Sequence, residues 1–169
     1  MVVVCWSLKG GAGTTVVSAA IALEASRRGD RPLLLDLAGD LSAVLGVDGS
    51  GSGIADWCSA TGGAGTEAID GLAVEVHGGA RVVSRGVAGW ESADPARLAL
   101  LVSSLGERTE LVVVDAGDLW TAMPPGGPPL DLIDPLLELA TRSVLVTRAC
   151  YLSLRRVGRQ VRRPTEVVL

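Results

Sequence analysis

A glycine-rich segment near the amino terminus is the first part of the chain whose residue types could do chemistry. It consists of Lys9, Gly10, Gly11, Ala12, Gly13, Thr14 and Thr15. Glycines allow successive backbone N–H groups to curl around phosphate oxygens, and a following helix would direct the positive end of its dipole to the same place. The segment therefore predicts a phosphate-binding loop, for which the alternative is a plain glycine-rich turn.

The segments on either side have the patterns that would position such a loop. Val2–Trp6 is a short apolar, β-branched run, which favours a buried parallel strand, expected to be the central one. Residues 16–28 have apolar and small residues at helical spacing and end in a basic turn before Gly29. Residues 32–37 predict a second strand.

The rest of the chain continues this alternation of strands and helices. We expect a short helix around 54–58 in a loop-rich stretch, a hairpin or a single strand over 72–84, a helix from the N-cap Asp94 to about Leu105, a strand over 111–114, an irregular segment over 116–130, a helix over 131–140, a strand over 143–147, a basic helix over 152–161 and a strand from 166. Such alternation implies a mostly parallel sheet with helices on both faces.

The composition agrees with one globular domain over residues 1–169. The chain is 48% hydrophobic and 20% charged, which allows a sizeable buried core. No apolar run reaches the roughly 18 residues of a membrane span and the first residues do not resemble a signal peptide, so we expect a cytoplasmic protein without a transmembrane segment. The three cysteines are far apart and suggest neither a disulfide framework nor a metal site.

The glycine loop resembles the deviant Walker A motif of the ParA/MinD superfamily of P-loop ATPases. In that motif a signature lysine precedes two glycines, and a second lysine follows the third glycine. Lys9 occupies the signature position and is the only lysine in a chain with 14 arginines. In the family the signature lysine reaches into the nucleotide site of the partner subunit, so the resemblance implies a homodimer to which Lys9 contributes.

The resemblance extends over most of the chain. The run 33–36 is similar to the family's second strand with its Walker A' aspartate, Asp36, and the run 111–115 is similar to Walker B, which ends in Asp115. Residues 145–148 and 152–156 are similar to the next strand and helix. The resemblance implies a C-terminally shortened ParA/MinD-like P-loop NTPase fold, because family members usually continue well beyond this strand.

The same resemblance implies ATP and Mg²⁺ as possible ligands. The loop residues 9–15 would surround the nucleotide together with Asp36 and Asp115. Thr15, Asp36 and Asp115 would hold the Mg²⁺ ion or its water shell, since Mg²⁺ prefers oxygen ligands.

Two departures from the family pattern predict a degenerate site. Thr14 stands in place of the P-loop lysine, and losing one preorganised charge of this kind typically costs about 100-fold to 1000-fold in rate, or roughly 3–4 kcal/mol. Ala38 replaces the second aspartate of the family's Asp-x-Asp, which resembles a water-activating residue. Asp40 lies two residues further along, a displacement of about 6–7 Å in an extended segment, so we expect it to be too distant to act instead. The same threonine pair occurs in the TadZ/CpaE branch, pilus-assembly relatives that act by localisation.

The basic residues are concentrated near the carboxyl end. Residues 141–169 hold seven arginines and one acid, net +6, and residues 1–140 are net −10. Helical spacing would place Arg155, Arg159 and Arg162 on one face. This cluster predicts a possible DNA or acidic-partner surface, and the alternative is a solvated face that balances the acidic body. Its members are Arg155, Arg156, Arg159, Arg162 and Arg163.

The sequence leads to three functional hypotheses. The first is a pseudo-ATPase that binds nucleotide weakly or not at all and acts by homodimerisation and binding of an unknown protein partner in intracellular positioning. The second is an active ATP-dependent partitioning ATPase, and the third is a DNA-associated scaffold that ignores nucleotide. The proline-rich run 123–129 could dock a partner or form a stiff linker, and His77 is expected to be inert.

Overall fold

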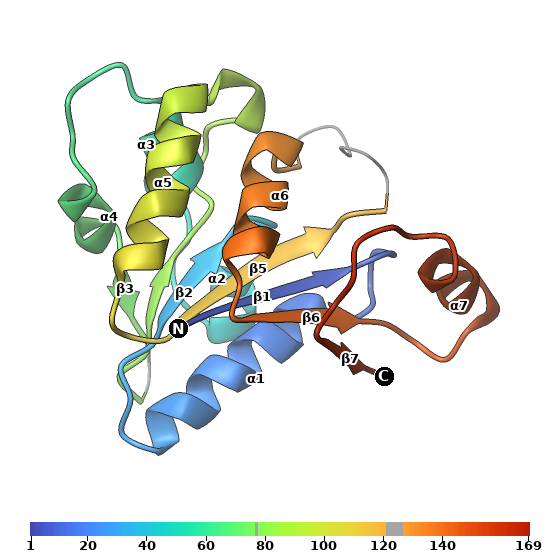
Figure 1. Cartoon of the computed structure of the whole chain (residues 1–169). Coiled ribbons are helices and arrows are strands. Elements are labelled where there is room, and N and C mark those ends of the chain that lie inside the picture. The colour runs from blue at the N-terminus through green and yellow to red at the C-terminus, as the bar shows by residue number, and fades with distance from the viewer. Residues whose placement is uncertain (77, 121–126) are drawn as a thin grey trace.

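The structure is a computed structural model that describes residues 1–76, 78–120 and 127–169. Its strands form one seven-stranded sheet in the order β3-β4-β2-β5-β1-β6-β7 (Figure 1). The pair β3–β4 is antiparallel, and the other neighbouring pairs are parallel. The strands are β1 (Val2–Ser7), β2 (Leu33–Asp36), β3 (Val74–Glu75), β4 (Arg81–Val83), β5 (Val112–Asp118), β6 (Arg142–Val146) and β7 (Glu166–Val168). The prediction of a mostly parallel sheet is confirmed.

Helices cover both faces of this sheet. They are α1 (Thr14–Arg27), α2 (Leu41–Leu45), α3 (Ile54–Ser59), α4 (Glu67–Gly71), α5 (Pro95–Glu107), α6 (Leu130–Leu139) and α7 (Tyr151–Val157), with the 3₁₀ turn η1 (Trp90–Ser92). Helices α1 and α2 lie on one face, and α3, α5 and α6 lie on the other (Figure 1). Among the described residues, no helix has the length and apolar character that crossing a membrane requires.

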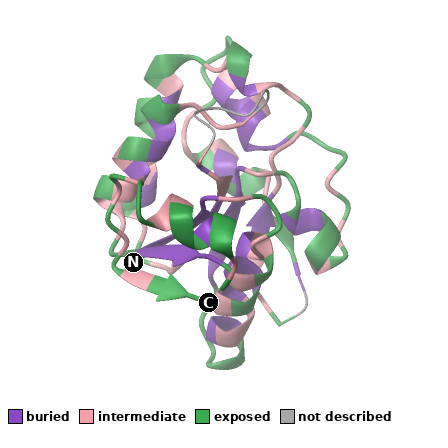
Figure 2. Ribbon diagram, turned by 90° about the vertical axis from the view of Figure 1, so that its right-hand side faces the viewer, coloured by how far each residue is buried: buried purple, intermediate pink, exposed green. Residues whose placement is uncertain are grey.

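The inner strands β1, β2, β5 and β6 are mostly apolar because both of their faces are buried. In β1, Val2, Val4 and Trp6 pack into the core beneath α5 and α6, whereas Val3 and Cys5 pack into the core beneath α1. Strands covered on both sides have near-continuous hydrophobic sequences instead of an alternating pattern. Figure 2 shows this arrangement, with buried strands at the centre and exposed residues on the outer sides of the helices.

Several local expectations differ from the structure. The middle strand is β5, which pairs with both β1 and β2, so β1 is an inner strand beside the centre. The segments 74–75 and 81–83 pair as a hairpin, so the alternative of a single strand over 72–84 is excluded. Helix α5 continues through Gly106 to Glu107. The short helices α2 and α4 were not expected.

His77 and residues 121–126 lie outside the described residues. The expectations for the histidine and for most of the proline-rich run 123–129 therefore stay predictions.

The N-cap of α5 allows a direct test of how the sequence determines where this helix begins. Asp94 Oδ1 accepts a hydrogen bond from Ala96 N at 2.8 Å, and Pro95 occupies the first helical position. Replacing the cap, Asp94→Ala, should lower the free energy of unfolding by about 1 kcal/mol, because a first-turn N–H loses its acceptor. Urea denaturation measures this change. The control Asp94→Asn retains an acceptor and should change stability little, and an equal loss in both variants would contradict the capping role.

Candidate nucleotide-binding site

The glycine loop lies between β1 and α1, as the sequence predicts. Gly11 has a φ of +74° and Gly13, the N-cap of α1, a φ of +102°. These values are in the left-handed region, where a side chain is strained and glycine is not. No atom lies within 4 Å of the position that a Cβ would take at either glycine. The loop is thus an open backbone turn in a conformation that favours glycine.

A cavity of about 490 Å³ opens beside this loop. No side-chain hydrogen bond caps the start of α1 in the described part of the chain, so the first-turn N–H groups are available to a ligand. The cavity is lined by Ser7, the loop residues Gly10 to Val16, the turn and helix residues Ala38, Asp40, Ala43 and Val44, and by Gly117 and Asp118 at the end of β5. Three segments that are distant in sequence thereby converge on the position of the glycine loop.

Asp36 and Asp115 lie beside this cavity, below its surface. They are direct neighbours in the parallel ladder between β2 and β5, and both are buried. Asp36 Oδ1 accepts from Gly39 N at 2.6 Å and Asp36 Oδ2 accepts from Leu41 N at 2.9 Å. Burial raises the pKa of Asp36, and these backbone hydrogen bonds act in the opposite direction. Asp36 thus fixes the turn between β2 and α2, because each of its oxygens accepts a backbone hydrogen bond from that turn.

Asp115 is the less satisfied member of the pair. Burial raises its pKa to about 6, the nearby Thr15 hydroxyl opposes the shift, and the charge of Asp36 adds to it. Asp115 Oδ1 accepts from Gly117 N at 3.2 Å, but the buried Oδ2 has no hydrogen-bond partner among the described residues. A hydrated cation could satisfy such an oxygen, and Thr15 lines the cavity next to it. The oxygens of Thr15 and Asp115 are therefore suited to hold an Mg²⁺ ion or its water shell. Asp36 would contribute by positioning the neighbouring turn.

Two further carboxylates line the cavity. The sequence does not predict Asp118 as a site residue, because the apolar run ends before Asp115. In the structure β5 continues to Asp118 and places it opposite Ser7. Asp118 Oδ1 accepts from Trp120 N at 2.9 Å, and its Oδ2 lies 3.9 Å from the position of a Cβ on Gly10. This oxygen therefore faces the phosphate loop.

Asp40 is the second of these carboxylates. The expectation that an extended segment would carry it away from the site is wrong, because the chain turns at Gly39, where φ is +103°, and Asp40 becomes the N-cap of α2. Asp40 is exposed at the mouth of the cavity.

The cavity thus has acidic side chains without basic ones. Among the described residues that line it, Asp40 and Asp118 are charged and there is no lysine or arginine. The positive end of an exposed helix dipole contributes about 0.3–1 kcal/mol to holding an anion. A carboxylate roughly 6 Å from a phosphate charge opposes binding by about 0.7 kcal/mol in water and about 3 kcal/mol at an effective dielectric constant of about 20. The two carboxylates therefore oppose the attraction of the helix dipole, and a cation that accompanies the phosphate would reduce this repulsion.

Thr14 and Ala38, the two residues that differ from the family's sequence pattern, both line this cavity. Thr14 is the first residue of α1 and is buried, with its hydroxyl as the one side-chain donor it can offer there. Ala38 forms part of the opposite wall. Lys9 is not among the described lining residues. The pKa of Cys150, which precedes α7, is lowered chiefly by the hydrogen bond with Ser153, and the charge of Lys9 makes a smaller contribution in the same direction.

The prediction that arginines share one face of a helix is wrong. Helix α7 ends at Val157, so Arg159 and Arg162 are not on it, and the shared helical face does not exist. The chain turns after Val157 and leads into β7, and Arg162 forms an ion pair with Asp134 at 2.7 Å.

The arginine Arg156 is also engaged within the chain. Its Nη1 donates to the Leu8 carbonyl at 2.7 Å, and its guanidinium lies 5.0 Å from the centre of the Trp120 ring. These contacts tie α7 to the residue that precedes the phosphate loop. Of the five arginines, Arg162 forms an ion pair and Arg156 binds a carbonyl and a ring within the described part of the chain, which reduces the basic surface open to DNA.

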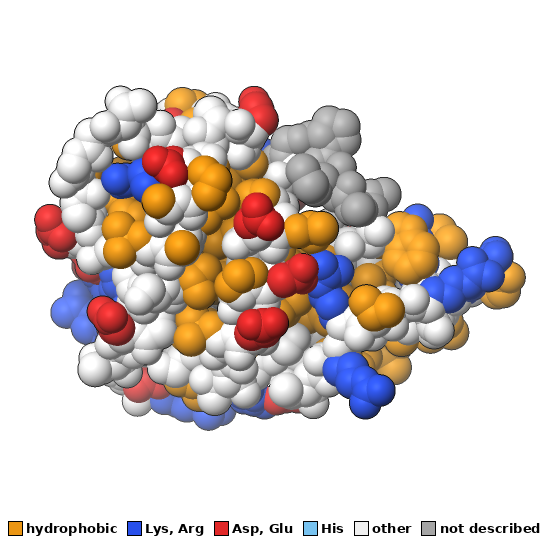
Figure 3. Space-filling model, turned by 45° about the horizontal axis from the view of Figure 1, so that its top comes forward, with side chains coloured by type: hydrophobic (Ala, Val, Ile, Leu, Met, Phe, Trp, Pro, Cys, Tyr) orange, Lys and Arg blue, Asp and Glu red, His pale blue; other side chains and the backbone are white. Residues whose placement is uncertain are grey.

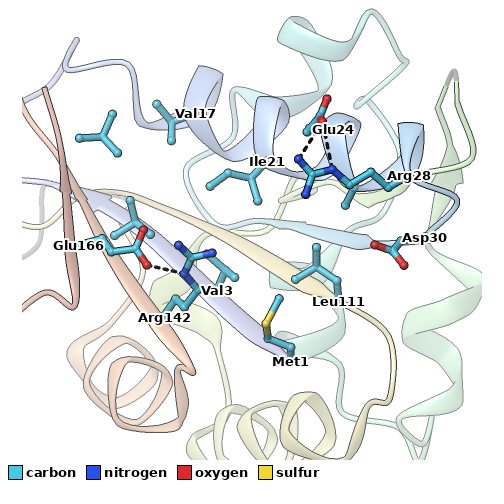
Figure 4. A pocket seen from close by; sticks show the side chains of 13 residues that line it. Met1, Val3, Val17, Ile21, Glu24, Arg28, Asp30, Leu111, Arg142 and Glu166 are labelled. Carbon is cyan, nitrogen blue, oxygen red and sulfur yellow. Dashed lines mark hydrogen bonds and ion pairs between the residues drawn. The ribbon is translucent and has the colours of Figure 1, made fainter.

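A second cavity of about 390 Å³ lies beneath α1, toward the amino ends of the strands (Figure 4). Val3, Val17 and Ile21 are among its apolar side chains, and ion pairs between Glu24 and Arg28 and between Arg142 and Glu166 lie at its rim (Figure 4). It includes none of the predicted site residues. The glycine-loop cavity is therefore the candidate functional site.

The comparisons with known proteins support this assignment at the level of the fold. No protein-family model and no curated protein matches the chain. The ParA family ATPase from Chlorobium tepidum TLS matches with a TM-score of 0.75 and 20% identity, over 98% of this chain and 71% of that one. The cell division ATPase MinD from Pyrococcus furiosus matches with a TM-score of 0.69 and 24% identity, over 94% of this chain and 63% of that one.

A third similar solved structure contains an adenine nucleotide and magnesium. Cobyrinic acid a,c-diamide synthase from Mycobacterium smegmatis, with bound ADP and magnesium, matches with a TM-score of 0.62 and 20% identity, over 99% of this chain and 72% of that one. The chain therefore has the P-loop NTPase fold of ParA- and MinD-type ATPases. It spans 63 to 72% of the length of these solved chains.

The raised pKa of Asp115 predicts a pH-dependent stability. Its value of about 6 in the folded state exceeds the ordinary value of about 3.9, so the folded chain binds a proton more tightly than the unfolded chain does. The ionised carboxyl therefore destabilises the fold above pH 6, and the stability returns as the pH falls toward 4. In metal-free buffer, Asp115→Asn should be more stable than wild type at pH 7, by at most about 3 kcal/mol.

Urea denaturation at pH 4, 5, 6 and 7 measures this difference, which should shrink as the pH falls. The exposed Asp30→Asn serves as the control and should show no such trend. A difference between Asp115→Asn and wild type that is the same at every pH would contradict the assignment.

Proposed function

We propose that this chain is a single-domain, cytoplasmic ParA/MinD-like protein with a degenerate nucleotide site. It acts by homodimerisation and partner binding in intracellular positioning, with weak or absent ATP hydrolysis. The observation that carries this proposal is the charge of the cavity beside the glycine loop, where Asp40 and Asp118 are present and the described lining residues include no cation.

The residues that would hold a nucleotide provide only part of a P-loop site. The open backbone at Gly11 and Gly13 and the uncapped start of α1 can donate N–H groups to phosphate oxygens. Thr15 and Asp115 would hold Mg²⁺, which would neutralise phosphate charge when bound. Binding of Mg-ATP therefore remains chemically available to the site, with low affinity.

The same site lacks the groups that turn binding into hydrolysis. Thr14 can donate one neutral hydrogen bond, where a lysine would place a full charge on the transferred phosphate. The Ala38 methyl group cannot accept a proton from water. A nucleotide that binds here would therefore persist without rapid turnover.

One observation favours the second hypothesis, an active ATPase. Asp40 lines the cavity and is exposed, so its carboxylate could orient a water molecule in place of the missing residue at position 38. Phosphate release from Mg-ATP by wild type and by Asp40→Asn separates the two functions. Our proposal expects slow release that the substitution leaves unchanged, whereas a brisk wild-type rate that is abolished in Asp40→Asn would establish the active enzyme.

Restoring the missing cation should restore affinity. Thr14→Lys should lower the dissociation constant for Mg-ATP by about 100-fold or more, because a lysine at this position adds a charge at the phosphates and opposes the field of Asp118. Isothermal titration calorimetry measures the effect, with Thr14→Ser as a neutral control that should bind as wild type does. Equal binding by all three proteins would show that the loop is not a phosphate site.

A further inference from the structure

A third cavity, of about 250 Å³, lies between α7 and the segment that follows β5. Its described lining consists of Trp120, Leu152, Arg155, Arg156 and Arg159. This lining has no acidic residue and shares no residue with the glycine-loop cavity. Figure 3 shows basic and hydrophobic side chains next to one another at this protruding end of the molecule. We call this cavity the α7 pocket.

Two of the lining residues are held in place by contacts to the rest of the chain. Arg156 Nη1 donates to the Leu8 carbonyl at 2.7 Å, and the Arg156 guanidinium lies 5.0 Å from the centre of the Trp120 ring. The backbone N–H of Trp120 donates to Asp118 Oδ1 at 2.9 Å. The pocket therefore has a preformed wall of indole ring and guanidinium. Binding there would require little further ordering of these two side chains, which reduces the entropic cost of binding.

The remaining side chains lie at the mouth of the α7 pocket. Arg155 and Arg159 are exposed, and Leu152 is 41% exposed. A guanidinium group binds carboxylate or phosphate oxygens through two parallel N–H donors. Together with Arg156, the two exposed arginines offer three positive charges to one anionic group. A phosphate monoester has a charge of about −1.5 to −2 at pH 7, so it matches this cluster better than a carboxylate does.

The wall and the volume of the pocket restrict what else such a ligand can contain. The Trp120 ring favours contact with another planar ring, and Leu152 adds an apolar surface. A volume of about 250 Å³ lies below the roughly 300–1,000 Å³ of sites for drug-sized ligands, which suits a single ring. We propose that the α7 pocket binds a small aromatic phosphate monoester, with its phosphate on the arginines and its ring against Trp120. This site is separate from the glycine-loop cavity and does not depend on the proposed function.

A nucleic-acid duplex suits the α7 pocket less well than a small ligand does. Residues 141–169 are net +6, but residues 1–140 are net −10, and Asp118 bonds directly to the backbone of Trp120. A duplex is held through many phosphates along an extended surface, where this acidic body would repel it. A small phosphate monoester meets only the arginines that line the pocket.

Titration with phenyl phosphate, followed by ligand-observed NMR at about 150 mM salt, tests the proposed chemistry. Inorganic phosphate supplies the charge without the ring, and benzyl alcohol supplies the ring without the charge. Phenyl phosphate should bind at least about 10-fold more tightly than either of them, because it uses the arginines and the Trp120 ring together. Equal affinity for phenyl phosphate and inorganic phosphate would overturn the inference.

Substitutions of the exposed arginines locate the bound probe. Arg155→Gln and Arg159→Gln, each first checked for folding by circular dichroism, should weaken phenyl phosphate binding by about 3-fold to 10-fold, since each removes a charged donor from an exposed site. Arg163→Gln is the matched control, because this exposed arginine belongs to the same basic segment and is outside the described lining. It should bind as wild type does. Equal losses in all three variants would show general attraction to the basic segment and would overturn the pocket.

Two further outcomes would also overturn the inference. If phenyl phosphate binds at the glycine loop instead, Thr14→Lys should tighten its binding, and Arg155→Gln and Arg159→Gln should leave it unchanged. If the arginines serve nucleic acid, a nonspecific DNA duplex should displace the probe at about 150 mM salt. The inference expects that Thr14→Lys changes the affinity for phenyl phosphate little and that the duplex does not displace it.

Discussion

Two buried carboxyl groups that lie side by side set the geometry of the candidate site. Asp36 and Asp115 are neighbours in the ladder between β2 and β5, and burial raises the pKa of each. The fold accommodates Asp36 by giving both of its oxygens backbone N–H donors, and this turn positions Ala38 and Asp40 against the phosphate loop. Asp115 keeps one oxygen without a partner among the described residues, and the proposed Mg²⁺ ion would be held at that oxygen.

The charge of the cavity decides what this geometry can do. The same fold occurs in ParA- and MinD-type ATPases and in a diamide synthase, so the fold alone does not specify a reaction. Here the glycine loop and the dipole of α1 attract phosphate, whereas Asp40 and Asp118 repel it. Any bound phosphate would depend on a cation supplied by Mg²⁺ or by another molecule. The proposed weak binding of nucleotide follows from this imbalance of charge.

Most of the fold and part of the site could be predicted from the sequence. The strands and the phosphate loop were predictable because an apolar run such as Val2–Trp6 and a glycine cluster are local signals. Asp118 was not predictable in this way, because the length of β5 depends on its pairing with Ser7 of β1. The position of Asp40 depends on a local turn held by the carboxyl of Asp36, which the strand pattern does not reveal. The end of α7 depends on the path of the chain from α7 to β7.

The most direct test of the account is the affinity of the unmodified chain for Mg-ATP, measured by isothermal titration calorimetry at about 150 mM salt. A site that lacks roughly 3–4 kcal/mol of cationic stabilisation should have a dissociation constant of about 0.1 mM or weaker. The affinity should fall further when Mg²⁺ is removed, because Asp40 and Asp118 then oppose the bare phosphates. Submicromolar binding, or binding that is indifferent to Mg²⁺, would contradict the central claim.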